Sequence, residues 1–284
     1  MDIRFLKSLI TVVETGSIAG AARLQCLTPA AVSQRIQALE RDMDCELLVR
    51  SAHTVKPTEN CLRLIPRARK LVREAEALKS DIDTSGLSGS LRIGAIATAL
   101  TGMLPSAIHN LTKNAPQIKL HITPGTSQRL YNELQAENLD AAILVAPPFA
   151  VSKEFIVDAL REEPLLLICK EINNRSVNNI LAQEPYISYD PQSWGGRIAE
   201  QYLADNGIAP KTLCELDALD TIHILVEEEM GVSLVPSWAG LKSKPNRLTI
   251  KTINNARYMR KIVLLTPKQP TIPKIIEKLK ASLQ

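Results

Sequence analysis

The chain has 284 residues, and its content of 45% hydrophobic and 23% charged residues suits two or three soluble domains with sizeable cores. The net charge is only +4, but residues 1–73 carry 12 Lys and Arg against 7 Asp and Glu, an excess expected of a segment that contacts phosphate. A transmembrane helix and a signal peptide are not expected, because no stretch approaches 18 uninterrupted apolar residues and no small-residue cleavage site follows the first apolar block.

Three helices are predicted at the N-terminal end. Apolar side chains recur at helical spacing over residues 3–14, and Ser17 can cap a short, Ala-rich helix over residues 18–24. After a three-residue link, Thr28 can cap a third helix that starts with proline, whose missing N–H would be unpaired there anyway. A short helix, a tight turn and a longer helix with a polar outer face are typical of a helix-turn-helix.

The third helix, in the segment TPAAVSQRIQALE, has an unusual outer face. At 100° per residue, Val32, Ile36 and Leu39 form an ordinary apolar stripe. A helix that enters the major groove of DNA needs little bulk near its N-terminus, and short or bidentate hydrogen-bonding groups at the base edges. The alternative is a face that contacts only water. The residues of the outer face are Ala30, Ser33, Gln34, Gln37 and Arg41.

A strand pair is predicted after these helices. Residues 46–50 and 54–57 are short segments on either side of a turn at 51–53, and they form a plausible wing beside the helix-turn-helix. Arg50 and Lys56 lie in these segments and could reach the DNA backbone.

A long helix is predicted from Thr58, a capping residue, to about residue 83. Apolar side chains recur along it at spacings of 4 and 3, which predicts a seam for a partner helix. The seam is short and contains Pro66, so we expect it to pair within a larger dimer, and the alternative is packing on its own domain. The seam residues are Leu64, Ala68, Leu71, Ala75, Leu78 and Ile82.

The pattern changes after a Ser- and Gly-rich segment at 85–90, which is predicted to be a hinge. Strands and helices then alternate, and this order predicts parallel sheets in two α/β units. The first unit has strands at 90–97, 118–125 and 139–146 and helices at 100–111 and 127–137. The second has strands at 164–170, 185–190, 213–217 and 231–236 and helices at 197–206 and 220–229. A strand at 261–266 and a helix at 273–283 suit the edge of the first unit.

Over essentially its whole length, this sequence resembles the LysR-type transcriptional regulators. Two positions depart from the usual pattern of the family: Ile18 often corresponds to Phe, and Cys61 commonly to Gly. Neither lies on the outer face of the third helix. The N-terminal segment looks like the branch that includes regulators of basic amino-acid export, but the C-terminal half does not, so that ligand is not inferred. The match rests on Gly16, Ser17, Ile18, Ala21, Ala22, Leu24, Thr28, Ala31, Val32, Ser33, Ile36, Leu39, Glu40, Leu47, Leu48, Arg50, Pro57 and Thr58.

The resemblance implies an α/β protein with an all-α N-terminal winged helix-turn-helix. A long dimerisation linker helix follows, and then a two-lobed effector domain like a periplasmic binding protein. The implied parts are a DNA-binding domain at 1–58, a linker helix at 59–84, a hinge at 85–90 and an effector-binding domain at 91–284. Lobe I comprises 91–162 and 266–284, and lobe II comprises 163–265.

The resemblance also implies two sets of functional residues. Ala30, Ser33, Gln34 and Gln37 are expected at the DNA bases, and Arg35, Arg50 and Lys56 at phosphates. Thr28 is also expected to bind DNA. An effector is expected at Thr98, Thr126, Ser127, Trp194 and Arg197, where helices begin after strands. Helix capping is the alternative for Thr98 and Thr126, and a salt bridge is the alternative for Arg197. Dimerisation is expected through Leu64, Leu71, Leu78 and Ile82.

These features predict a cytoplasmic, ligand-responsive DNA-binding regulator that senses a small polar metabolite, an anionic one if Arg197 contacts it. An enzyme is the less favoured class, because the sequence lacks the G-x-S-x-G, G-x-G-x-x-G and G-x-x-x-x-G-K-[ST] motifs. A solute-binding protein would need a secretory signal. Expected partners are double-stranded DNA, a second copy in a dimer or tetramer, the effector and RNA polymerase. No membrane, cofactor or metal partner is expected, because Cys26, Cys45, Cys61, Cys169, Cys214 and the four histidines lack metal-ligand spacing.

Overall fold

The computed structural model describes residues 2–50, 55–82, 87–171, 175–242 and 247–283. The predicted wing turn at 51–53 and residues 85 and 86 of the predicted hinge lie outside this described part. The chain divides into two compact units, residues 1–89 with 136–138, and residues 90–135 with 139–284. No single helix in the described ranges is long and apolar enough to cross a membrane.

The first unit contains the three predicted helices. Each starts at a side-chain cap: Asp2, Ser17 and Thr28 accept hydrogen bonds from main-chain N–H groups of the first turn. Gly16 ends the first helix in the left-handed conformation (φ 64°) that glycine adopts without strain. The helices are α1 (Ile3–Thr15), α2 (Ile18–Leu24) and α3 (Pro29–Met43).

A two-stranded wing and a long helix complete this unit. β1 (Leu48–Arg50) pairs antiparallel with β2 (Val55–Pro57), and Thr58 Oγ1 accepts a hydrogen bond from Cys61 N to start α4 (Glu59–Ile82). The buried side of α4 packs against the core made by α1 to α3. This buried stripe is Cys61, Ile65, Ala68 and Val72.

The predicted seam on α4 therefore only partly faces away from its own domain. Ala68 is fully buried inside the unit, and Leu64 and Leu71 pack against the core while remaining partly exposed. Leu78 is 62% exposed. The side chain of Ile82 lies outside the described residues. Packing on its own domain, the alternative for this helix, thus accounts for Ala68 and not for Leu78.

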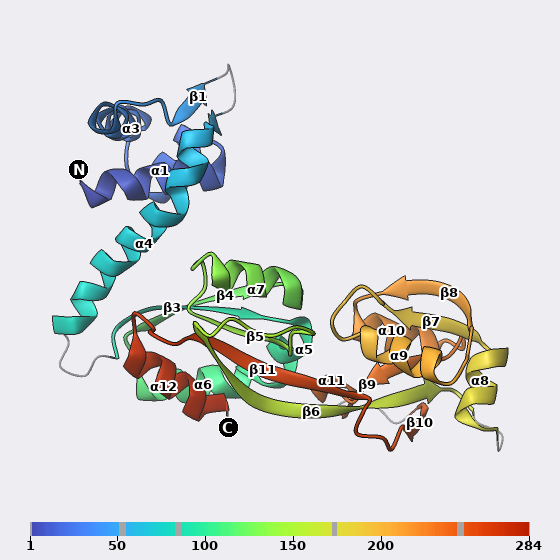
Figure 1. Cartoon of the computed structure of the whole chain (residues 1–284). Helices are drawn as coiled ribbons and strands as arrows, with labels where there is room; N and C mark the ends of the chain where they lie inside the picture. The colour runs from blue at the N-terminus through green and yellow to red at the C-terminus, as the bar shows by residue number, and fades with distance from the viewer. Residues whose placement is uncertain (1, 51–54, 83–86, 172–174, 243–246, 284) are drawn as a thin grey trace. The chain divides into compact units, whose positions relative to one another are not determined.

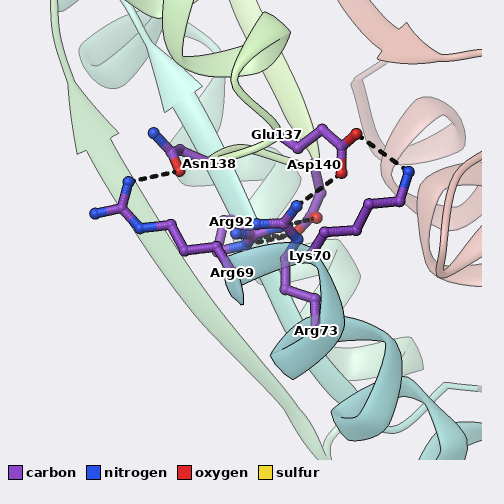
Figure 2. Close-up of polar contacts among 7 residues, drawn as sticks. All are labelled: Arg69, Lys70, Arg73, Arg92, Glu137, Asn138 and Asp140. Carbon is purple, nitrogen blue, oxygen red and sulfur yellow. Dashed lines mark hydrogen bonds and ion pairs between the residues drawn. The ribbon is translucent and has the colours of Figure 1, made fainter. Parts of the chain in front are cut away.

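Residues 136–138 belong to the first unit, in which cations of α4 bind them (Figure 2). Lys70 Nζ lies 3.3 Å and Arg73 Nη2 2.8 Å from the Glu137 carboxylate. Arg69 Nη1 donates to Asn138 Oδ1 at 3.0 Å. Glu137 has a left-handed backbone (φ 56°), which is uncommon outside glycine and fixes the direction of its side chain. Beyond this segment, in the second unit, the Asp140 carboxylate pairs with Arg92.

A mixed sheet forms the frame of the second unit. In the described chain its strand order is β10-β6-β11-β5-β3-β4, with β9 also paired to β6. β3 and β5 are parallel, whereas β11 runs antiparallel to both β5 and β6. The strand expected at the edge of the first lobe, β11, is therefore internal. These strands are β3 (Gly89–Ala95), β4 (Ile118–Pro124), β5 (Ala141–Val145), β6 (Phe155–Cys169), β9 (Ser233–Pro236), β10 (Thr249–Thr252) and β11 (Met259–Pro267).

The second unit has two lobes, and β6 and β11 run side by side between them (Figure 1). In lobe I, α12 packs on α6, and α7 packs on β5. In lobe II, two buried clusters surround the parallel pair β7 and β8. Lobe I contains α5 (Ala97–Gly102), α6 (Leu104–Asn114), α7 (Ser127–Gln135) and α12 (Pro273–Leu283). Lobe II contains α8 (Val177–Gln183), β7 (Pro185–Tyr189), α9 (Arg197–Asp205), β8 (Lys211–Leu216), α10 (Leu219–Glu227) and α11 (Ala239–Lys242).

Several elements differ from the sequence-based expectations. The single helix expected over residues 100–111 is two helices that break at Met103, because Pro105 has no main-chain N–H to donate to a carbonyl of the preceding turn and is tolerated in the first turn of a new helix. β6 begins nine residues earlier than expected, at Phe155. Three short elements, α8, β10 and α11, were not predicted. Gly89 and Ser90 of the expected hinge already belong to β3.

Candidate functional site

The two sides of α3 differ as the helical period predicts. Val32, Ile36 and Leu39 are 0% exposed and hold the helix on the core. On the other side, Ser33 is half-buried, and neither Gln34 nor Gln37 makes a hydrogen bond with the described part of the chain. The two amide groups are therefore free to bond with a macromolecule along this side. The exposed residues of this outer face are Ala30, Gln34, Gln37 and Arg41.

Thr28 and Arg35 make contacts within the domain. Thr28 is exposed, and its Oγ1 accepts a hydrogen bond from Ala31 N as the cap of α3. Arg35 is half-buried, and its Nη1 donates to Ser8 Oγ on α1 at 3.2 Å. The expected contact of Arg35 with phosphate remains a prediction.

The wing is tied to α3 by one carboxylate. Glu40 Oε1 accepts from Leu47 N at 2.9 Å and from Leu48 N at 3.2 Å, which fixes the start of the wing against the helix. From the sequence, Glu40 was recognised only as part of the family pattern, and this role was not predicted. Burial raises the pKa of the neighbouring Cys61 thiol to about 11, and the Glu40 carboxylate adds to that shift.

The cations expected at phosphates lie on the wing. Lys56 is exposed and pairs with Val49 across the two strands. Arg50 is the last residue of β1 and pairs with Val55 through its backbone. Both positions are thus on the strand pair that Glu40 fixes next to α3.

An ion pair lies where the two lobes of the second unit meet. Arg260 and Glu163, 2% and 3% exposed, are opposite each other on β11 and β6. Arg260 Nε and Nη2 lie 2.7 and 2.5 Å from Glu163 Oε2. This pair was not predicted from the sequence. The only sign of it there is that a charged residue lies just outside each of two apolar runs.

Arg260 also contacts both lobes. Its Nη2 donates to Thr98 Oγ1 of α5 at 3.3 Å, and its Nη1 donates to the hydroxyl of Tyr189 at 3.4 Å. Burial raises the pKa of Tyr189, and the Arg260 charge opposes that shift. Burial also raises the pKa of Asp217, and the nearby Asp190 carboxylate adds to the shift. The Tyr189 hydroxyl is thus held in its protonated form at this junction.

Thr126 and Ser127 both lie at the start of α7. Thr126 is exposed, and its Oγ1 accepts from Arg129 N at 3.4 Å, the capping role that was the alternative for this residue. Ser127 is buried, and its Oγ accepts from Val145 N at 3.1 Å, which joins α7 to β5. Only Thr126 therefore has an exposed side chain.

Trp194 packs across the two lobes. It is 7% exposed, and its Nε1 donates to Gln128 Oε1 of α7 at 3.3 Å. Its ring centroid is 6.0 Å from that of Tyr131 and 5.5 Å from that of Phe149, with the Phe149 ring edge-on. Arg197, in contrast, is exposed and makes no ion pair with the residues that the structure describes.

Two glycines fix the turn that presents Trp194. A Cβ on Gly195 would lie 2.5 Å from the Tyr189 hydroxyl, and one on Gly196 would lie 2.0 Å from the Asp190 carbonyl oxygen. Ser193 Oγ bonds to the same carbonyl oxygen. The turn is therefore packed tightly against the end of β7.

The described ranges of the chain contain no group of three or more His, Cys, Asp and Glu side chains that could hold a metal ion. All five cysteines are described, and each is a free thiol.

Comparison with known proteins places both parts of the chain. Residues 3–62 match the model "Bacterial regulatory helix-turn-helix protein, lysR family", and residues 84–284 match the model "LysR substrate binding domain". The nitrogen assimilation regulatory protein nac of Klebsiella aerogenes is 25% identical over 246 residues, covering 84% of this chain and 79% of that protein. A probable nitrogen assimilation transcriptional activator of Synechococcus elongatus is 26% identical over 285 residues, covering 95% and 90%.

Solved structures show the same fold. A full-length OxyR variant from Pseudomonas aeruginosa superposes with a TM-score of 0.75 at 21% identity, covering 100% of this chain and 94% of that one. Full-length CbnR complexed with its target DNA superposes with a TM-score of 0.69 at 18% identity, covering 99% and 100%. At these identities the likeness concerns the fold alone.

Proposed function

The chain belongs to the LysR family of bacterial transcriptional regulators, and from that premise we propose which residues read DNA and which bind the effector. It is a ligand-responsive DNA-binding regulator, a class of protein that acts without catalysis. The observation that carries the DNA proposal is the exposed amide face of α3 opposite a fully buried apolar stripe. We assign base reading to this face, from Thr28 to Gln37, and phosphate contacts to the wing.

Gln34 is proposed to bind one base edge directly. Replacing Gln34 with Ala should weaken binding to a preferred duplex by about 1–3 kcal/mol and relax selectivity at one base pair, because a bidentate amide contact is lost. The measurement is fluorescence anisotropy with a duplex that the wild-type protein selects from a random-sequence pool. Gln117→Ala, an exposed glutamine of the second unit, is the matched control. An equal loss on selected and random duplexes would show that Gln34 does not read sequence.

The wing cations are proposed to bind phosphate without regard to sequence. Changing Lys56 or Arg50 to Ala should weaken all duplexes alike and lower the slope of log K against log salt concentration by about one unit per half-site. Titrations at four or more salt concentrations give this slope. Lys153→Ala removes an exposed cation of the second unit and should leave the slope unchanged. A wild-type slope in the wing variants would place these cations away from the DNA.

The effector is proposed to bind where α5 and α7 start, between the two lobes. Support comes from the fold: in open α/β sheets, ligands bind beyond the carboxyl ends of the strands, where helix N-termini offer free N–H groups. We assign Thr98, Thr126, Ser127, Trp194 and Arg197 to this site. Because Glu163 already neutralises Arg260, an anionic effector would depend on Arg197, which has no partner in the described chain.

A thermal-shift screen of amino acids and small carboxylates on the full chain tests this site. A true effector should raise the melting temperature in a concentration-dependent way, because it binds the native state and not the unfolded chain. We further propose a cytoplasmic dimer that assembles as a tetramer and communicates with RNA polymerase. The partly exposed leucines of α4 support the dimer.

A further inference from the structure

A polar network runs through the interior of the helix-turn-helix. Ser8 is 0% exposed, and its Oγ donates to Gln25 Oε1 at 2.8 Å. Gln25 Nε2 in turn donates to Thr11 Oγ1 at 2.8 Å and to the Lys7 carbonyl oxygen at 3.2 Å. Arg35 Nη1 donates to the remaining acceptor position of Ser8 Oγ at 3.2 Å. Thr11 Oγ1 donates to the Lys7 carbonyl oxygen at 2.8 Å, so the donors of Ser8, Gln25 and Thr11 all have acceptors.

The network joins all three helices of the domain through side-chain hydrogen bonds. Ser8 and Thr11 lie on α1, Gln25 directly follows α2, and Arg35 lies near the middle of α3. The residue after Gln25, Cys26, has a left-handed backbone (φ 53°), so the turn between α2 and α3 is sharply defined.

Apolar packing alone would hold the rotation of α3 loosely. The stripe of Val32, Ile36 and Leu39 supplies burial, which is favourable but has no preferred direction. A hydrogen bond from a guanidinium to a buried hydroxyl has a preferred direction and a short reach. Arg35 follows Gln34 in sequence, so any rotation of α3 that broke the bond to Ser8 would also turn Gln34.

We infer that Arg35 is a positioning residue for the recognition face of α3, acting through Ser8 and Gln25, and not a phosphate contact. The inference rests on the proposed base-reading role of α3. It assigns Arg35, a half-buried cation in the middle of α3, to a contact within the domain, and it leaves the phosphate contacts to the wing.

Salt dependence separates the two roles. A phosphate contact predicts that Arg35→Ala lowers the slope of log K against log salt by about 0.9 per half-site. A positioning role predicts an unchanged slope together with a loss of about tenfold in affinity for the selected duplex, since a hydrogen bond to a charged group is lost. Ser8→Ala changes no charge. It should also leave the slope unchanged and lower the affinity for the selected duplex about tenfold.

Arg35→Lys provides a second and sharper test. Lysine would preserve a phosphate contact as a point charge, but it lacks the planar guanidinium that reaches Ser8, so positioning predicts the same loss as Arg35→Ala. Lys56→Ala is the positive control for a reduced slope, and circular dichroism with thermal melting confirms that each variant is folded. A reduced slope in Arg35→Ala that Arg35→Lys restores would overturn the inference. If wild-type protein selected no duplex at all, the proposed function would fail instead.

Discussion

Replacing Arg260 with Met should lower the free energy of unfolding of the effector unit by about 3–5 kcal/mol, because it leaves the Glu163 carboxylate buried without its partner. Both side chains are at most 3% exposed, so water cannot take the place of the lost guanidinium. The expected loss is a large fraction of the total stability of a domain. Urea denaturation followed by circular dichroism measures it.

The chain offers a matched control one residue along the same two strands. Lys261 pairs with Glu162 at 3.4 Å, but both side chains are more than half exposed, so Lys261→Met should cost less than about 1 kcal/mol. The double variant Arg260→Met, Glu163→Leu should regain much of the lost stability, because an apolar pair of similar volume needs no desolvation compensation. Equal costs for Arg260→Met and Lys261→Met would disprove a stabilising role for the buried pair.

Two contacts across the lobes relate this stability to regulation. Arg260 binds Thr98 in lobe I and Tyr189 in lobe II, and Trp194 of lobe II binds Gln128 of lobe I. An effector placed among these residues can shift the lobes only by the difference in its affinity for the two arrangements, typically about 1–3 kcal/mol. Because Arg260 contacts Thr98 of the proposed effector site and also pairs with the buried Glu163, its substitution would change effector binding and stability together. The exposed Arg197 is the cleaner position for effector measurements.

Local sequence signals made the helices of the N-terminal unit predictable. Ser17 and Thr28 fix helix starts through bonds to N–H groups three residues away, and the 3.6-residue period separates Gln34 from Ile36 without any knowledge of the fold. Four of the five residues predicted for the outer face of α3 are exposed, and the fifth, Ser33, is half-buried. The contact of Arg35 was not predicted, because that residue lies at the margin between the two faces and its partner Ser8 lies 27 residues away.

Long-range pairing accounts for most of what the sequence did not show. The first half of β6 mixes apolar and charged residues, none of them fully buried, and it forms a strand because β11, about 100 residues later, pairs with it. The same pairing brings Glu163 and Arg260 together across 97 residues, which no local pattern records. On α4 the apolar spacing predicted a seam that includes Leu64, Ala68 and Leu71. The buried stripe is instead Cys61, Ile65, Ala68 and Val72, so only Ala68 belongs to both.

Replacing Leu71 and Leu78 with Glu should convert the proposed dimer into monomers. Leu64, Leu71 and Leu78 follow each other at intervals of seven, and all three retain exposed surface, from partial at Leu64 and Leu71 to 62% at Leu78. A leucine row at this spacing suits the seam of a second helix, and buried carboxylates would be repelled from it. Because two linked half-sites bind far more tightly than one, DNA affinity should fall by about 100-fold or more. Light scattering gives the mass, and anisotropy gives the affinity.

The same helix supplies the control for this experiment. Leu62 is 56% exposed but lies about 160° around α4 from Leu78 at 100° per residue, so Leu62→Glu should leave the dimer intact. The single variant Leu78→Glu separates loss of the dimer from local unfolding. Leu71 also packs on its own domain, so its substitution can unfold part of that domain. A dimer of unchanged mass in Leu78→Glu and in the double variant would exclude the leucine row as the interface. Dissociation by Leu62→Glu and not by Leu78→Glu would move the interface to the opposite side of α4, where the two copies would meet through a different set of contacts.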